Sequence, residues 1–235
     1  GKNNLEETFP TSQPINDPEA PMEIVLYYAP TTCALVPYVT LTEAKAEFEV
    51  RRVNFGKQQH MSPEFLAVNP KHKVPVLVID GKVLTENVAM QLWLSRQFPA
   101  AKLMPTDPWD EVKAISLMSW CASGIHPHLS RTHDPLKFCD VSGTEANVRE
   151  LAKGFLFENL EVAEHLLVGR EYFFDHFSAV DAHFFWCFRR AGQFGHDLSS
   201  LPNCCTHFEL MQRRESFKKV LAFEKEVMAE FSEAA

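Results

Sequence analysis

Apolar positions in the first hundred residues alternate between short runs typical of strands and stripes with helical spacing. Strands are predicted at 23–28, 48–53, 76–79 and 82–84. Helices are predicted between and after them, at 35–44, 63–69 and 87–98. Asp80 and Gly81 stand between the last two strands, and this pair is a usual turn of a type I′ hairpin. The order strand, helix, strand, helix, strand, strand, helix predicts a thioredoxin-like α/β domain.

From about residue 110 onward the apolar spacing is helical almost throughout, which predicts an all-α domain. Helices are predicted at 112–121, 148–167, 184–188, 208–211 and 217–231. Two capping boxes, Ser142 with Glu145 and Ser178 with Asp181, predict where the second and third of these helices begin. The segment from Ser123 to Pro127 is expected to kink or stop the first helix.

Prolines indicate the borders between these parts. Residues 1–21 combine Pro10, Pro14, Pro18 and Pro21 with few apolar residues, so we expect an extended arm there. Prolines recur between residues 99 and 108, which predicts a linker. The predicted organisation is an arm at 1–21, a thioredoxin-like domain at 22–100, a linker at 101–109 and a helical domain at 110–235.

Composition and charge narrow the possible partners. A net charge of −8 and a pI near 5.7 disfavour nucleic acid and anionic membranes, because both bind broad positive potential. We find no run of eighteen apolar residues and no secretory signal, and we expect a cytoplasmic protein. The six cysteines show no C-x-x-C spacing, which is typical of a reducing compartment and disfavours a zinc site or a disulfide framework.

Three segments of the first domain carry candidate chemistry. Cys33 stands near the start of a predicted helix, where free N–H groups stabilise a thiolate and lower its pKa from about 8.5, although Pro37 limits the effect. Pro75 heads a strand, and a cis Val74–Pro75 bond would turn the backbone edge of Val74 outward, towards a peptide ligand. The helix N-terminus at Glu86 can bind a carboxylate.

Together these motifs resemble the cytosolic glutathione transferases, and in particular the beta class, the mostly bacterial type with an active-site cysteine. The resemblance spans about residues 22 to 232. It rests on four segments in matching order: Tyr27 to Tyr38, Asn69 to Leu77, Leu84 to Ala89 and Phe177 to Ala182. The resemblance implies a glutathione-binding thioredoxin-like domain, a helical domain that holds a hydrophobic electrophile, and a homodimer.

The resemblance also implies roles for single residues. Cys33 lies beside the glutathione sulfur, Val74 pairs its backbone with the tripeptide before a cis Pro75, and Glu86 with Asn87 holds the γ-glutamyl end. His126 matches the histidine that the helical domain directs into the cleft. This chain departs from the class in having Asn87 where serine is frequent and Pro127 where lysine is frequent.

Charge complementarity assigns the ends of glutathione. The tripeptide carries one ammonium group, for which Glu86 is the candidate partner. The glycine carboxylate needs a cation. The candidate cations are Lys57, Lys71, His72 and Lys73, and Lys57 stands one residue from where the class places its lysine.

These observations predict a glutathione transferase that conjugates the glutathione thiol, as a co-substrate, to hydrophobic electrophiles in detoxification. An alternative is a glutathione-dependent thiol-disulfide oxidoreductase with Cys33 as nucleophile. A further alternative is a glutathione-fold protein that binds without turnover. Metal binding by His126, His128 and His133 is disfavoured, because neighbouring prolines make the local geometry irregular, so no metal is expected.

Overall fold

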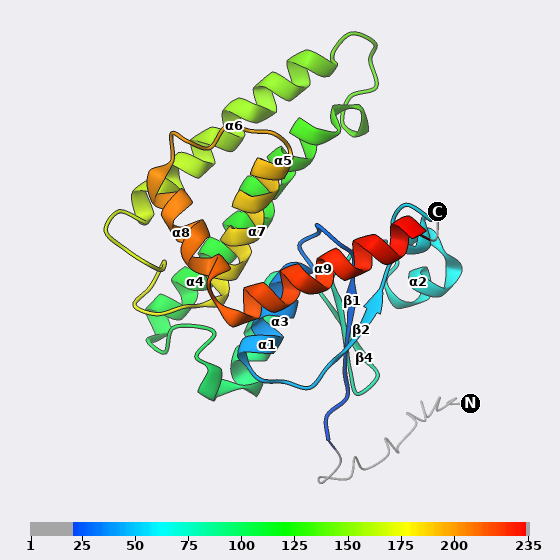
Figure 1. Cartoon of the computed structure of the whole chain (residues 1–235), viewed down its shortest axis with the longest axis vertical. Helices are drawn as coiled ribbons and strands as arrows, with labels where there is room; N and C mark the ends of the chain where they lie inside the picture. The colour runs from blue at the N-terminus through cyan, green and yellow to red at the C-terminus, as the bar shows by residue number, and fades with distance from the viewer. Residues whose placement is uncertain (1–20, 234–235) are drawn as a thin grey trace, which may run out of the picture.

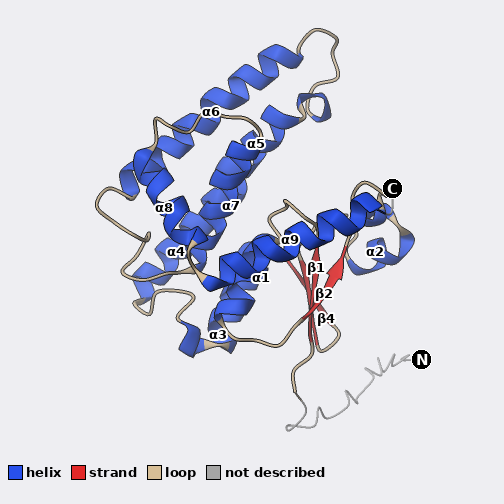
Figure 2. Ribbon diagram, viewed as in Figure 1, coloured by secondary structure: helices blue, strands red, loops and turns tan. Residues whose placement is uncertain are grey.

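The computed structural model of this chain describes residues 21–233, so nearly all of the predicted arm lies outside the described residues. Its β-sheet has four strands in the order β2-β1-β3-β4 (Figure 2). Strand β1 pairs in parallel with β2 and antiparallel with β3, and β3 pairs antiparallel with β4. The strands are β1 (Ile24–Tyr28), β2 (Glu49–Arg52), β3 (Val76–Ile79) and β4 (Lys82–Thr85).

The hairpin between β3 and β4 has the predicted turn. Asp80 and Gly81 both adopt positive φ, at 47° and 78°, which a type I′ turn requires. The turn sets Leu77 opposite Leu84 in the ladder. The polar segment that leaves β4 is thereby placed next to the segment that enters β3.

Three helices complete the predicted order of a thioredoxin-like domain. They are α1 (Leu35–Glu43), α2 (Pro63–Val68) and α3 (Asn87–Gln97). Helix α2 begins as predicted, because Ser62 accepts a hydrogen bond from the Phe65 N–H and Pro63 occupies the first turn. The α/β part of the fold prediction is therefore confirmed.

The remainder of the described chain is helical (Figure 1). Its helices are α4 (Pro108–Trp120), a π-helical turn η3 (Cys121–Ile125), α5 (His126–His133), α6 (Glu145–Leu166), α7 (Ala179–Gln193), α8 (Pro202–Gln212) and α9 (Glu215–Glu233). Short 3-10 turns are η1 (Gln59–Met61), η2 (Pro99–Ala101) and η4 (Pro135–Lys137). No helix among residues 21–233 is long and apolar enough to cross a bilayer.

The predicted kink is the π-helical turn, but the chain then continues as α5, a helix that the sequence did not predict. Pro127 is compatible with α5 because it falls in the first turn, where no intrahelical N–H donor is needed. The π-helical turn thus separates α4 from α5 and leaves His126 as the first residue of α5.

Only one of the two predicted capping boxes is present. Ser178 and Asp181 form the predicted box at the start of α7, where one oxygen of Asp181 accepts the Ser178 N–H at 2.8 Å. The box predicted at Ser142 is wrong, because α6 begins after Thr144, whose hydroxyl donates to the Val141 carbonyl at 2.6 Å. A turn through Gly143, with φ of 83°, precedes it.

Helix α7 is the buried centre of the helical part, with Phe184 and Phe185 fully enclosed. Helix α9 leaves this part and lies across α1, as Figure 1 shows. Its Phe223 packs against Tyr28 of β1 and Tyr38 of α1, both with ring centroids 5.3 Å apart. The last described helix therefore packs on the first described strand and helix.

Candidate active site

A small cavity of about 160 Å³ lies where the thioredoxin-like part meets the helical part. It is lined by Cys33, Asn69, Lys73, Val74, Pro75, Thr85, Glu86, Asn87, Ala122, His126 and His183. All of the predicted site residues are in this set except three of the four candidate cations, Lys57, Lys71 and His72. The loops that follow β1 and β4, the loop before β3, and the helices α5 and α7 thus contribute to one site.

Cys33 lies in the loop between β1 and α1, with its sulfur 3.7 Å from the Val74 carbonyl oxygen. The Asn87 side-chain amide donates to the Cys33 carbonyl at 3.1 Å. Burial raises the pKa of the Cys33 thiol to about 12, which outweighs a backbone hydrogen bond and the nearby Lys73. The expected lowering of this pKa is wrong, because α1 begins only at Leu35 and its N-terminus does not compensate for desolvation.

The segment before β3 presents Val74 to the cavity, and its Val74–Pro75 peptide bond is cis, as expected. Asn69 organises this segment. Its side-chain amide donates to the Lys73 carbonyl at 2.8 Å, and its side-chain oxygen accepts the Lys71 N–H at 3.1 Å. Asn69 is 1% exposed, so it is a buried support of the site that sequence reasoning did not single out.

Glu86 is the residue at the N-terminal boundary of α3, and its φ of 72° is unusual for a residue with a side chain. Its carboxylate forms an ion pair with Lys71, whose ammonium also donates to the Thr85 hydroxyl at 2.8 Å. Lys71 is therefore engaged at the Glu86 end of the cavity. The neighbouring Asn87 has a buried side-chain oxygen with no hydrogen-bond partner among residues 21–233.

His126 enters from the helical part, and its ring packs against Trp186 of α7 with centroids 4.5 Å apart. Burial lowers the pKa of His126 to about 4, and the nearby cations Lys73 and Arg190 act in the same direction. The imidazole is therefore neutral at physiological pH. Lys57, in contrast, does not line the cavity, and its backbone N–H donates to the Asn54 side chain at 3.1 Å.

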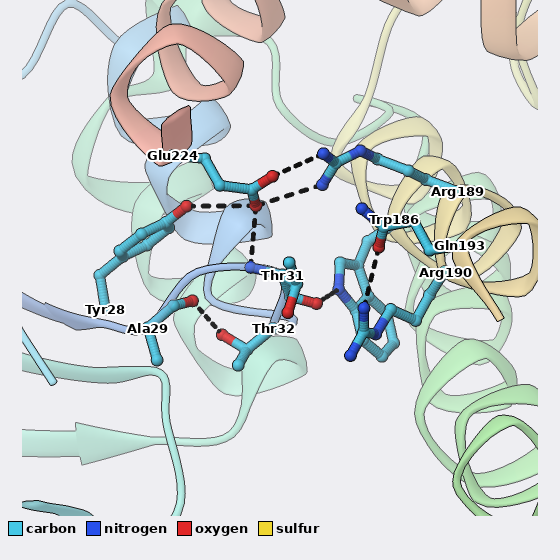
Figure 3. Close-up of polar contacts among 9 residues, drawn as sticks. All are labelled: Tyr28, Ala29, Thr31, Thr32, Trp186, Arg189, Arg190, Gln193 and Glu224. Atoms are coloured by element: carbon cyan, nitrogen blue, oxygen red, sulfur yellow. Dashed lines mark hydrogen bonds and ion pairs between the residues drawn. The ribbon is translucent and has the colours of Figure 1, made fainter. Parts of the chain in front are cut away.

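The Cys33 loop is fixed by a network that sequence reasoning missed (Figure 3). Thr31 has a φ of 65°, a rare conformation for a β-branched residue. Its N–H donates to Glu224 of α9 at 2.8 Å, and its carbonyl accepts the Trp186 indole N–H at 3.1 Å. Arg189 of α7 donates to both Glu224 oxygens, at 2.5 and 3.2 Å. Two helices of the helical part thus hold the loop that carries the thiol.

His183 of α7 also lines the cavity and was not among the predicted site residues. It is 1% exposed, and its Nδ1 has no hydrogen-bond partner among residues 21–233. Burial lowers the pKa of His183 to about 3, with a smaller effect from His126. The sequence signal that could have identified His183 is a single histidine within the apolar segment that follows the capping box.

No group of three or more His, Cys, Asp and Glu side chains in the described range 21–233 is arranged to hold a metal ion. The polar groups that converge on the cavity are instead a thiol, an amide, a carboxylate, an ammonium and two neutral imidazoles. They can bind an organic molecule that carries charges of both signs and place a sulfur or oxygen atom next to a neutral proton donor.

Comparison with known proteins finds similarity to glutathione S-transferases. Residues 22–96 match the family model described as glutathione S-transferase, N-terminal domain. The chain is 27% identical to glutathione S-transferase GstA of Escherichia coli O157:H7 over 202 residues, which are 85% of this chain and 98% of that protein. It is 30% identical to a probable maleylacetoacetate isomerase of Caenorhabditis elegans over 61% of this chain and 65% of that protein.

A solved structure agrees with these matches. It is a sphingomonad glutathione S-transferase complexed with glutathione, with a TM-score of 0.75, 27% identity, and coverage of 86% of this chain and 98% of that one. The shared fold includes the thioredoxin-like sheet and the helical part that follows it. Over most of its length the chain is therefore similar to glutathione S-transferases, and its residues 22–96 match the model of their N-terminal domain.

Proposed function

We propose that the protein is a glutathione transferase that binds glutathione in the cavity at Cys33 and joins its sulfur to a small hydrophobic electrophile. The observation that carries this proposal is that one cavity collects Cys33, Val74, Glu86, Asn87 and His126 from four separate segments and both parts of the fold. Bound glutathione in the related sphingomonad structure supports the same ligand here.

Charge distribution along the cavity supports one orientation of the tripeptide. Glu86 binds the ammonium, with Lys71 yielding part of its ion pair, and the N-terminus of α3 with the Asn87 side chain binds the γ-glutamyl carboxylate. Val74 pairs its backbone with the middle of the tripeptide. Lys73 takes the glycine carboxylate, since it lines the cavity and Lys57 does not.

The sulfur of glutathione then lies between Cys33 and His126. Cys33 acts as a neutral thiol, because its pKa of about 12 keeps it protonated at physiological pH. The neutral His126 donates a hydrogen bond to the glutathione sulfur and so favours its thiolate form. This assignment follows the beta-class pattern, with the thiol beside the co-substrate.

The raised pKa of Cys33 is also the reason for preferring conjugation to thiol-disulfide exchange. Exchange needs a thiolate as the attacking group, and a half-buried thiol with a pKa near 12 supplies little of it. The second substrate enters on the side of the helical part, where Ala122 and His126 line the cavity.

We also propose that the protein forms a homodimer and works in the cytoplasm. Helix α6 presents an exposed apolar stripe of Leu151, Phe155, Val162 and Leu166, whose spacing places them on one helix face. Exposed apolar stripes are typical of protein contact surfaces. All six cysteines are free in the structure, which suits a reducing compartment.

The test is to measure glutathione binding by calorimetry and conjugation of a model electrophile by steady-state kinetics, in wild type and in two matched lysine variants. Lys73→Ala should weaken glutathione binding several-fold, because it removes a charge-assisted bond. Lys57→Ala is the control and should leave binding unchanged. Absence of binding in the wild type, or equal effects of the two substitutions, would contradict the proposal.

A further inference from the structure

His183 is placed on the face of α7 that looks into the cavity. It precedes Trp186 by three residues, and residues at that spacing share a helix face. Trp186 itself packs on His126 and donates to the Thr31 carbonyl beside the thiol loop. His183 therefore lines the same cavity as Cys33 and His126, on the wall that the helical part supplies.

The free Nδ1 of His183 needs an explanation. A buried polar atom that lacks a partner destabilises the fold, so a residue that only fills space would be apolar at this position. His207, which is also buried in the helical part, likewise has an unpartnered Nδ1 among residues 21–233, but its Nε2 bonds to Asp181 at 2.9 Å and it does not line the cavity. His183 differs from it because its unpartnered Nδ1 belongs to a residue that lines the cavity.

We propose that His183 is a substrate-binding and specificity-determining residue, whose Nδ1 donates a hydrogen bond to an oxygen atom of the electrophile. This role rests on the proposed transferase function and names the substrate class: acceptors with a carbonyl oxygen conjugated to the reactive carbon. Glu86, Asn87 and Lys73 serve the charged groups of glutathione, so the nitrogen of His183 is left for the second substrate.

The proposed reaction needs only glutathione, the electrophile and water. The glutathione thiolate forms a carbon–sulfur bond at the β-carbon of an α,β-unsaturated ketone, and the electron pair of the carbon–carbon double bond moves to give an enolate. His183 donates its N–H to the enolate oxygen as the negative charge develops there, and the α-carbon then takes a proton from water. A donor aimed at developing charge in a buried site accelerates such a step. The imidazole is neutral at neutral pH and thus carries one N–H and one acceptor.

The experiment compares two electrophiles across His183 variants. Benzylideneacetone is an α,β-unsaturated ketone, and benzyl chloride reacts by displacement of chloride and carries no oxygen. His183→Leu should lower kcat/KM about tenfold or more for benzylideneacetone and leave the value for benzyl chloride within about twofold. Glutathione binding, measured separately, should not change.

Two polar variants keep the test informative if the leucine variant is unstable. His183→Asn places an amide near the position of Nδ1 and should retain the ketone reaction, whereas His183→Gln places it near Nε2 and should not. Indistinguishable kinetics of these two variants, or an equal fall for both electrophiles in His183→Leu, would overturn the role of His183. A wild-type protein that conjugates neither electrophile would instead refute the transferase function itself.

Discussion

Glu224 offers the sharpest test of how the helical part supports the thiol loop. The Glu224 carboxylate is 3% exposed and accepts hydrogen bonds from Arg189 and from the Thr31 N–H. Glu224→Ala leaves the Arg189 guanidinium without its partner, and breaking a buried ion pair in this way costs about 3–5 kcal/mol. Because the Arg189 side chain is 17% exposed and regains some hydration, we expect the free energy of unfolding to fall by about 2–4 kcal/mol in Glu224→Ala.

The assay is urea unfolding, with the free energy of unfolding extrapolated to water. For a chain of 235 residues the loss corresponds to a fall in Tm of roughly 4–16 °C. Glu224→Gln is the matched control, because its amide oxygen still accepts the Thr31 N–H while the charge is lost, so its stability should fall between wild type and Glu224→Ala. The paired change Arg189→Met with Glu224→Leu should recover most of the loss, because no buried charge remains.

The same variants report on the site. Release of the Thr31 N–H frees the loop that precedes Cys33, so alkylation of Cys33 by iodoacetamide should be faster in Glu224→Ala than in Glu224→Gln at one pH. Unchanged stability in Glu224→Ala, or failure of the paired apolar replacement to recover stability, would refute the view that this buried ion pair holds the loop.

Three further results are expected. In the unliganded protein the alkylation rate of Cys33 should keep rising with pH from 6 to 9, because the raised pKa keeps the thiol protonated there; a plateau below pH 8, seen by mass spectrometry, would show a lowered pKa instead. Glu86→Ala should raise the Kd of glutathione by tenfold or more in calorimetry, since a bond between charged groups contributes about 1.5–3 kcal/mol, and an unchanged Kd would remove Glu86 from the ammonium site. Ser178→Ala should lower the free energy of unfolding by about 0.5–2 kcal/mol, and Asp181→Ala should lower it further, because Asp181 also bonds to His207 and to the Phe173 N–H; equal losses in urea unfolding would contradict this reading.

Local chemistry explains which parts of the fold were predictable. Asp80 and Gly81 specify their turn through backbone conformation alone, and Ser62 and Ser178 cap helices through neighbours three residues away. The capping box predicted at Ser142 is also absent for a local reason, because the Thr144 hydroxyl instead donates a hydrogen bond to the Val141 carbonyl. A sequence pattern does not say which of two nearby hydroxyl residues begins the helix.

Site residues that stand in recognisable sequence motifs could be predicted. Properties and residues that depend on tertiary packing could not. Cys33 was placed correctly beside Val74, but the direction of its pKa shift depends on how much protein covers the sulfur. Glu224 and His183 lie about 190 and 150 residues from Cys33 in the chain, and no local pattern connects them to it. Only the tertiary arrangement of α7 and α9 shows that they support or line the same cavity.

The position of α9 has a consequence for biosynthesis. Tyr28 and Tyr38 are covered by Phe223, so the first strand and helix keep an aromatic surface open until α9 has been translated. Nascent chains with such uncovered surface are prone to association. Ribosomes that stall before α9 should therefore hold a protease-sensitive N-terminal half, and its protection should arise only when the last helix reaches it.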